Sequence, residues 1–418
     1  MAAIVPFRAL RPVPAVVSQV AAVPYDVVSV AEAAALAADN PLSFLRVSRA
    51  EIELGADVDA HSDAVYTRAA QNLSRLTTAA PLVVEDRPSL YVYRLRMGDH
   101  VQIGVAGCFS LDEYDAGRIK KHEKTRADKE DDRTRHLLAL AAQTGPVLLT
   151  YGSRADVSHG VERAIHAAPL FDFVAVDGVQ HTVWQVPADV ERDLVAAFVD
   201  VPALYIADGH HRAASASRAR RHDRRHDRDA AAGAIARTAG ASREWDTLLA
   251  VAFPDDQMQV LPYNRVVRDL GRHTSGSLMD ALAQVATVQP GPPVPTRAGD
   301  VSMFMDGRWY TIALPLPPRG LAADAHLDVS RLQAIVLEPL LGIGDPRSDA
   351  RIDFVGGARG TSTLEARVRS GAAAVAFSMY PVSVRDLMGI ADAGGIMPPK
   401  STWFEPKLRD GVLSHLLG

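Results

Sequence analysis

Paired apolar runs joined by short turns are the feature that most constrains what this chain can fold into. In each pair, apolar and polar residues alternate on both sides of a turn made of glycine and aspartate. The three turns are Gly98-Asp99, Asp177-Gly178 and Asp306-Gly307. Such a turn between alternating runs is a strong signal for a β-hairpin. Helical patterns lie between the hairpins, at residues 29–39 and 63–78 among others. The sequence therefore predicts an α+β fold with mixed or antiparallel sheets and interleaved helices.

Composition excludes several classes of protein. With 418 residues, 48% of them hydrophobic and 23% charged, the chain is long enough for two or three domains with a sizeable core. The formal net charge of −5 gives no sign of nucleic-acid binding. The single cysteine, Cys108, excludes a disulfide framework and a zinc site made of thiolates. It lies in an apolar run, so we expect it in a buried strand.

The sequence gives no sign of a membrane segment or a signal peptide. No apolar stretch reaches the roughly 18 residues that a membrane span requires. The first residues carry Arg8, Arg11 and several prolines, which is unlike a signal peptide. We therefore expect a cytoplasmic protein without a membrane partner.

Proline-rich stretches suggest the boundaries along the chain. The first 24 residues are expected to be extended, and a helix is expected after Ser29, an N-cap with Glu32 three residues later. Residues 289–300 are rich in proline and glycine and are predicted to be a linker. This divides the chain into a main domain of residues 1–288 and a C-terminal α/β portion of residues 301–418, which is expected to pack on it.

The stretch Asp208-Gly-His-His-Arg212 has the strongest functional pattern. A buried strand is expected to end at Asp208, and a helix is expected to begin at His210. A helix N-terminus presents free backbone N–H groups and a partial positive charge, and Gly209 lets an anion approach them. His210, His211 and Arg212 add side-chain donors where the helix dipole disfavours cations, which indicates that an anion lies among them. The alternative is a polar helix start in which Asp208 is only the N-cap and the histidines bond to their neighbours.

Two further polar stretches have functional and structural interpretations. Residues 118–136 are nearly free of apolar side chains and are expected to form a loop or an exposed helix start. Their candidate chemical pairs are His122-Glu123 and Asp132-Arg133, and a charged loop without function is the alternative. Residues 218–228 hold six arginines and two aspartates, which favours a solvated helix face over a nucleic-acid patch.

The metal and nucleotide motifs are incomplete. The His122-Glu123 pair lacks the spacing of the H-E-x-x-H zinc motif, so a dedicated zinc site is disfavoured. Magnesium that arrives with a nucleotide needs only one or two carboxylates, and Asp208 is the candidate ligand. Residues 394–401 have the spacing of a phosphate-binding loop, but Pro399 stands where a glycine is needed. Lys400 stays a candidate phosphate contact outside that motif.

Several stretches together resemble a widespread bacterial family catalogued as domain of unknown function ten-fifteen. They occur in one order and cover nearly the whole chain from Ile4. The stretches are Pro24-Tyr-Asp-Val-Val, His122-Glu-Lys-Thr, Asp132-Arg133, Ala142-Gln-Thr-Gly-Pro, Ala207-Asp-Gly-His-His-Arg and Met397-Pro-Pro-Lys-Ser-Thr-Trp-Phe-Glu-Pro-Lys-Leu. The Asp-Gly-His-His-Arg stretch is also similar to one in archaeal free-serine kinases of the ParB and sulfiredoxin-like superfamily.

The resemblance implies a nucleotide-dependent kinase with a ParB/sulfiredoxin-like element around this stretch. Residues 209–212 would bind phosphate, and Asp208 would lie beside the transferred group. His122, Arg133 and Lys400 are the further candidates for nucleotide binding.

The expected function is the transfer of a phosphoryl group from ATP or ADP, with Mg²⁺, to a small hydroxyl compound, free L-serine first. Glu123 is the candidate base because of its polar neighbours, and Asp26 is a further catalytic candidate. The alternatives are a phosphatase and a ParB-like regulator that binds nucleotide or DNA without turnover. The sequence leaves the acceptor, the choice of nucleotide and the oligomeric state open.

Overall fold

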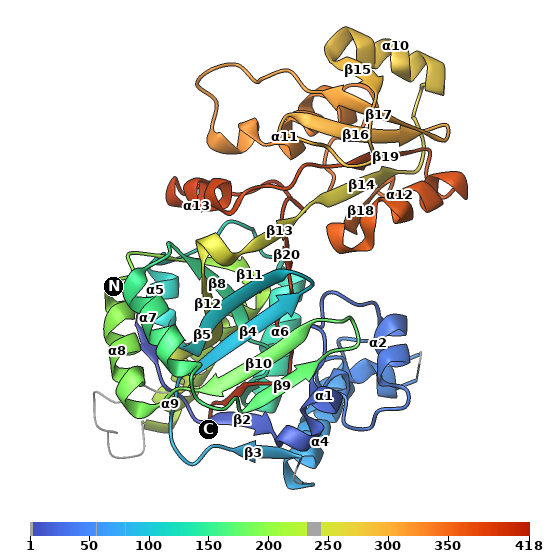
Figure 1. Cartoon of the computed structure of the whole chain (residues 1–418). Coiled ribbons are helices and arrows are strands. Elements are labelled where there is room, and N and C mark those ends of the chain that lie inside the picture. The colour runs from blue at the N-terminus through green and yellow to red at the C-terminus, as the bar shows by residue number, and fades with distance from the viewer. Residues whose placement is uncertain (1–2, 56, 80, 232–243) are drawn as a thin grey trace. The chain divides into compact units, whose positions relative to one another are not determined.

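The chain folds into two compact units that interleave along the sequence. The computed structural model describes residues 3–55, 57–79, 81–231 and 244–418, with residues 225–231 described by their backbone only. One unit comprises Met1–Met258 and Pro406–Gly418, and the other comprises Gln259–Glu405. Both units combine helices with sheets, which confirms the predicted α+β class (Figure 1).

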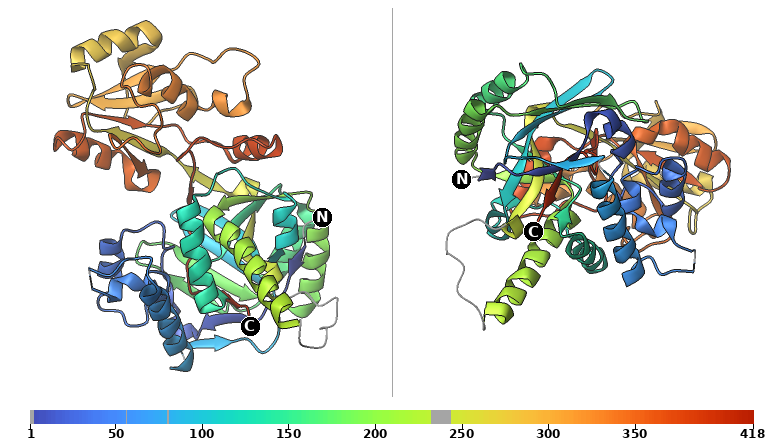
Figure 2. Two further views of the ribbon diagram at one scale, coloured as in Figure 1. Left: turned by 180° about the vertical axis from the view of Figure 1, so that it is seen from behind. Right: turned by 90° about the horizontal axis from the view of Figure 1, so that it is seen from below.

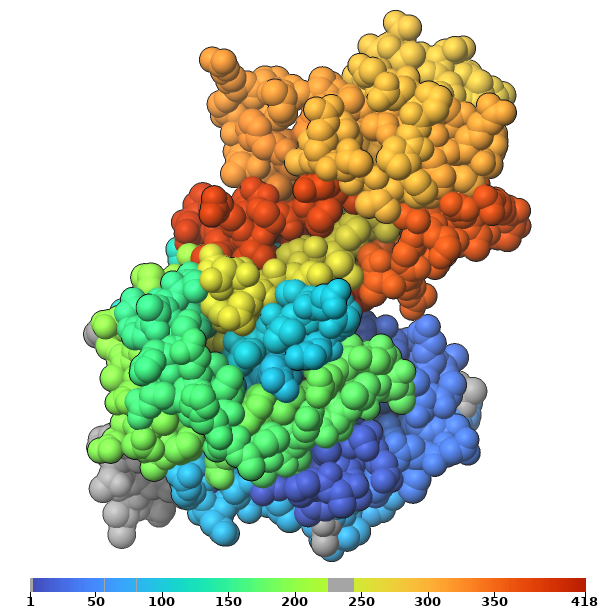
Figure 3. Space-filling model, in the orientation of Figure 1, coloured from blue at the N-terminus to red at the C-terminus, as the bar shows by residue number. Residues whose placement is uncertain are grey.

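A mixed sheet forms the centre of the first unit. Its strands are, in spatial order, β6 (Ile119–Lys120), β11 (Leu204–Asp208), β8 (Val147–Tyr151), β12 (Thr247–Pro254), β5 (His100–Ser110), β4 (Tyr91–Met97), β10 (Gln180–Gln185) and β9 (Phe171–Val174), with β1 (Ile4–Val5) beside β5. β11 is parallel to β6 and antiparallel to β8, and β12 is parallel to β8. The β4–β5 and β9–β10 hairpins lie side by side at the surface (Figure 3). They confirm two of the predicted hairpins.

Helices cover both faces of this sheet. α6 (Ala127–Leu140) and α9 (His210–Ala231) pack side by side on one face, whereas α7 (Ala155–Ala164) and α8 (Ala188–Val199) pack together on the other (Figure 2). α5 (Leu111–Asp115) contacts α9. The apolar core lies between these layers and includes Phe109, Phe198 and Ile206, which are all fully buried.

The N-terminal part of the first unit forms a second layer. β2 (Ala9–Pro12) joins β3 (Leu82–Val84), β21 (Ser414–Leu416) and β7 (Ala142–Gln143) in a small sheet. Its helices are α1 (Val17–Val20), α2 (Val30–Ala37), α3 (Leu45–Ser48) and α4 (Asp63–Thr78). The capping box of Ser29 and Glu32 at α2 and the helix over residues 63–78 are confirmed. The expectation of a wholly extended N-terminus is wrong, because α1 places Val17 and Val20 in the core.

The second unit is built on an antiparallel sheet. Its strands are, in spatial order, β15 (Thr287–Pro290), β17 (Arg308–Ala313), β16 (Asp300–Met305), β19 (Val375–Ser378), β14 (Tyr263–Val267) and β18 (Ile352–Gly356). Its helices are α10 (Ser275–Val285), α11 (Asp328–Leu332), a π-helix (Gln333–Leu337), α12 (Gly360–Arg369) and α13 (Val384–Asp392), and β13 (Gln259–Leu261) pairs with β20 (Trp403–Glu405). The β16–β17 pair confirms the third predicted hairpin.

The predicted linker and the domain boundary are wrong. The stretch 289–300 lies inside the second unit, where β15 pairs with β17 and the Gly299 N–H donates to Asp328. Pro290 is tolerated because β15 is an edge strand that ends there. The chain leaves the first unit after Met258 and returns at Pro406.

Among the helices that the structure describes, none is long and apolar enough to cross a bilayer. Cys108 is buried in β5, as predicted, and its sulfur lies 3.2 Å from Nδ1 of His415.

Candidate functional site

The turn between β11 and α9 holds the Asp208-Gly-His-His-Arg212 stretch. β11 is buried up to Ala207, so the strand brings Asp208 to its end next to the start of α9. Gly209 has a φ of +97°, which favours glycine. A Cβ atom on Gly209 would lie 3.0 Å from Nε of Arg212, so the guanidinium folds back over this glycine. The group that approaches the Gly209 backbone closely is therefore the guanidinium of Arg212.

Arg212 and Lys407 both bind the carboxylate of Asp208. Nη2 of Arg212 donates to Oδ2 at 2.8 Å, and Nζ of Lys407 donates to Oδ1 at 3.2 Å. Burial raises the pKa of Asp208, but Lys407 and Arg212 outweigh it and hold the pKa at about 2. Nη1 of Arg212 donates to the Pro146 carbonyl, whereas its buried Nε has no partner among the described residues. Asp208 is thus ionised and held by two cations.

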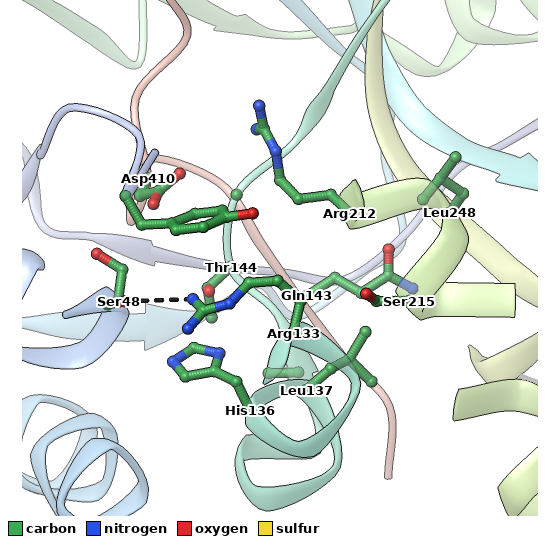
Figure 4. A pocket seen from close by; sticks show the side chains of 13 residues that line it. Ser48, Arg133, His136, Leu137, Gln143, Thr144, Arg212, Ser215, Leu248 and Asp410 are labelled. Carbon is green, nitrogen blue, oxygen red and sulfur yellow. Dashed lines mark hydrogen bonds between the residues drawn. The ribbon is translucent and has the colours of Figure 1, made fainter. Parts of the chain in front are cut away.

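A cavity of about 50 Å³ lies beside Arg212 (Figure 4). Arg133 of α6 and Arg212 of α9 both line it, together with Tyr25, Thr144 and Asp410. Arg133 donates to the Ser48 carbonyl, pairs with Asp132 at 2.8 Å and stacks over the Tyr25 ring at 4.2 Å. The structure therefore brings together two of the predicted arginines, and each already pairs with a carboxylate.

Asp410 faces this cavity without a partner. The residue is only 3% exposed, and its carboxyl group has no ion pair or hydrogen bond among the described residues. Burial raises the pKa of Asp410 to about 7, with Arg212 and Arg133 opposing and Asp26 reinforcing the shift. A buried polar group without a partner is uncommon in folded proteins and needs an explanation.

Asp26 and His211 border the same region. Asp26 is exposed, and its charge acts on Arg212 and Asp410. Burial lowers the pKa of His211, whose Nε2 accepts the Arg126 backbone N–H at 3.2 Å, and the Asp26 charge opposes that shift. The charges of Asp26 and Asp208 thus both act on Arg212, although neither residue lines the cavity.

Gly145 provides a direct test of the cavity. A methyl group on Gly145 would overlap Oδ1 of Asp410 and lie 3.6 Å from Cδ of Arg212. We therefore expect Gly145→Ala to displace the Asp410 carboxyl and to weaken binding of any small molecule in the cavity at least tenfold, measured by calorimetry. Gly152→Ala is the matched control, because a Cβ there meets nothing within 4 Å. Unchanged binding in Gly145→Ala would show that the cavity is not used.

Glu123 lies on another side of the α9 start, next to two buried histidines. Oε2 of Glu123 is 3.8 Å from Nδ1 of His210, and the rings of His122 and His210 are 4.4 Å apart. Burial lowers the pKa of His122 to about 4 and that of His210 well below its usual range. Both imidazoles are therefore neutral at pH 7, so the stretch does not present three cations. Its permanent cation is Arg212, whose partner is Asp208.

A larger cavity of about 220 Å³ opens beside Glu123 and His210. Lys121 and, from α9, Arg218 and Arg221 also line it. One ligand atom each of His122, Glu123 and His210 lie within 4.8 Å of one another. The ligands of a bound zinc ion lie about 3.4 Å apart, so these side chains would have to move closer to hold one.

Two predicted features differ in the structure. A helix does start within residues 118–136, since α6 begins at Ala127, but its polar Asp132 and His136 are buried and not exposed as predicted. The arginine-rich stretch extends α9, as expected, but Arg220 is buried and pairs with Asp112 and Asp115. The side chains of residues 225–228 lie outside the described part of the chain.

Lys400 belongs to the second unit, where its Nζ lies 5.4 Å from the centre of the Tyr263 ring. Its role in phosphate binding stays a prediction.

Sequence reasoning missed Lys407 and Asp410. Both lie close to the C-terminus, in a short return of the chain to the first unit. The signal was present: Lys407, Arg409 and Asp410 follow one another closely before the apolar run at residues 412–413, and all three are buried. A buried polar cluster of this kind is typical of a functional site.

Comparison with known proteins shows the family. The family described as "Protein of unknown function (DUF1015)" matches residues 4–332. The chain belongs to this family. No curated protein matches its sequence.

Solved structures similar to the chain include three that each cover 73% of it. One is a free serine kinase in complex with AMP, 13% identical, with 91% of that chain covered and a TM-score of 0.35. Another is a conserved hypothetical protein from Pyrococcus furiosus, 14% identical, with 93% covered and a TM-score of 0.34. The third is SbnI with a C-terminal truncation from Staphylococcus aureus, 10% identical, with 85% covered and a TM-score of 0.36.

Proposed function

We propose that this protein is a phosphotransferase that moves the terminal phosphoryl group of ATP or ADP to the hydroxyl group of a small molecule. Free L-serine is the first acceptor to test, because the Asp208-Gly-His-His-Arg212 stretch resembles that of free-serine kinases. The partners are thus a nucleotide and a small hydroxyl substrate.

One observation carries the proposal: the N-terminal half of α9 lines two cavities that hold charged side chains. α9 contributes His210, Arg218 and Arg221 to the larger cavity and Arg212 to the smaller one. Three cations line the larger cavity and suit the nucleotide phosphates: Lys121, Arg218 and Arg221. Three carboxylates also line it and suit the magnesium that accompanies a nucleotide: Asp115, Glu123 and Glu130. The smaller cavity combines arginines with a carboxylate and suits a small acceptor. Phosphoryl transfer needs mainly such positioning and charge neutralisation.

Magnesium accompanies the nucleotide in this proposal. Asp208, the predicted ligand, fits it poorly because both carboxylate oxygens already accept hydrogen bonds from cations. Glu123 fits better, since its side chain is 47% exposed and borders the larger cavity. Magnesium keeps several waters and binds through phosphates and one or two carboxylates, so a single protein carboxylate suffices. When bound, the ion would neutralise charge on the phosphates.

The acceptor hydroxyl must lose its proton as its oxygen bonds to phosphorus and the nucleotide leaves. A carboxylate within about 3 Å of that hydroxyl would serve as the base. We propose two candidates. Asp26 acts electrostatically on Arg212 and Asp410, which line the smaller cavity, and would be the base if Glu123 holds magnesium. Glu123 would be the base only for an acceptor hydroxyl that reaches the larger cavity, with magnesium then held by phosphates and water. Asp208 is a weaker candidate because its pKa of about 2 leaves it a poor proton acceptor.

A panel assay tests the proposal. Purified protein is incubated with ATP or ADP, magnesium and each of a set of hydroxyl metabolites, and nucleotide turnover is recorded. We expect turnover that requires one class of acceptor. Nucleotide binding without turnover for any acceptor would favour a ParB-like regulator, and release of phosphate from phosphorylated metabolites would favour a phosphatase.

A further inference from the structure

Two carboxylates near the smaller cavity differ from the other charged groups around it. Among the described residues, the carboxyl groups of Asp26 and Asp410 show no hydrogen bond or ion pair, and each acts electrostatically on the other. The nearby arginines do not neutralise these two carboxylates, because Arg133 pairs with Asp132 and Arg212 pairs with Asp208. The region therefore holds more negative than positive charge, and one of its carboxylates is almost fully buried.

The fold keeps Asp410 aimed into the cavity. The backbone of Asp410 pairs with that of Ala22 in both directions, at 2.9 and 3.1 Å, which fixes the residue. The neighbouring Arg409 is held by Asp177 and His181. On the opposite side Gly145 leaves room for the carboxyl oxygen that any larger residue would fill. A buried carboxylate held in this way, lining an open cavity, is suited to receive a cationic group.

We propose that Asp410 receives the protonated amine of the acceptor, and that the acceptor is therefore a hydroxyl compound that carries a primary ammonium group. This inference rests on the proposed function and names the chemistry by which its acceptor is selected. Asp26, the second carboxylate, adds to the attraction.

A primary ammonium fits this cavity better than a magnesium ion does. The cavity is about 50 Å³, and its walls include Leu137, Leu248 and Ala142. Magnesium demands near-octahedral coordination by six oxygens and would bring waters with it. The guanidinium groups of Arg133 and Arg212 also border the site and repel a doubly charged ion more strongly than a single positive charge.

Three probe ligands separate the contribution of the acceptor's amine to binding from that of its carboxylate. L-serine carries an amine and a carboxylate, ethanolamine carries the amine alone, and 3-hydroxypropanoate carries the carboxylate alone. Binding of each to the full chain is measured by calorimetry, with and without nucleotide and magnesium. We expect the two amines to bind the wild type at least tenfold more tightly than 3-hydroxypropanoate. Asp410→Asn should remove that preference while leaving 3-hydroxypropanoate binding within about twofold.

The controls keep the test decisive. Asp39→Asn changes an exposed aspartate of α2's neighbourhood and should bind like the wild type, and melting curves confirm that each variant is folded. Equal binding of the three probes by the wild type, an equal loss of all three in Asp410→Asn, or tighter binding of Mg²⁺ than of either amine would each overturn the inference. If amine binding depends on Asp410 but no phosphoryl group is transferred, the proposed function fails and the amine site stands. If 3-hydroxypropanoate is phosphorylated as fast as L-serine, the proposed function stands and the amine site fails.

Discussion

Arg212→Ala should lower phosphoryl transfer by about 100- to 1000-fold, the usual effect of removing one preorganised charged donor from a reaction centre. Arg212 is the permanent cation at the start of α9, and it lines the proposed acceptor cavity. The substitution also removes a partner of Asp208 and should destabilise the fold by about 3 kcal/mol, near the low end for a broken buried pair. Initial rates and chemical denaturation measure the two effects.

The controls for Arg212 separate charge from geometry. Arg212→Lys keeps the charge but loses the forked donors, so it should recover the stability more than the rate. Arg163→Ala removes an arginine of α7 that pairs with Asp189 and Asp193, and it should leave the rate unchanged. A rate in Arg212→Ala within threefold of the wild type would exclude Arg212 from the reaction.

Asp410→Asn should make the protein more stable at pH 8 while it impairs function. Burial raises the folded-state pKa of Asp410 from its ordinary value of 3.8 to about 7, although Arg212, Arg133 and Arg409 oppose the shift; Asp26 adds to it. Near pH 3 the carboxyl is protonated in both states and costs nothing. Between pH 4 and pH 7 the unfolded chain ionises first, so stability is lost as pH rises, and the full loss persists above pH 7. A shift of this size corresponds to an upper limit of about 4 kcal/mol.

The measurement for Asp410 is a pair of denaturation experiments. The stability gain of Asp410→Asn over the wild type should be larger at pH 8 than at pH 5, since asparagine cannot ionise. Asp39→Asn, at an exposed position, should show no such pH dependence. A loss of stability at pH 8 in Asp410→Asn would mean that a partner satisfies this carboxylate in the folded protein.

Local signals made much of the fold predictable. The hairpin turns at Gly98-Asp99, Asp177-Gly178 and Asp306-Gly307 depend on a few neighbouring residues, and all three hairpins form. The same holds for the capping box of Ser29 and Glu32. The unit boundary was not predictable in this way, because it depends on the chain returning at Pro406 after a whole second unit. The prolines between residues 289 and 300 lie in an edge strand and the loop after it, not at the boundary between the units.

The site shows the same division between local and long-range information. The turn at Asp208, Gly209 and His210 was predictable because a strand, a glycine and a helix start follow one another in the sequence. The charges of these side chains were not predictable from the sequence. Burial keeps His210 neutral, and Asp208 is bound by Lys407, which lies 199 residues away in the sequence. Asp410 was missed for the same reason, since only the folded chain brings it to Arg212.

Phosphoryl transfer to an acceptor is detected by following a labelled phosphoryl group. The protein is incubated with magnesium, L-serine and ATP or ADP labelled on the terminal phosphate, and the products are separated. We expect labelled O-phosphoserine with the wild type, formed in step with the loss of label from the nucleotide, and a yield at least 100-fold lower with Arg212→Ala. Label that stays in the nucleotide or appears only as inorganic phosphate, with L-serine and with every other amine-bearing hydroxyl compound, would exclude the proposed phosphoryl transfer.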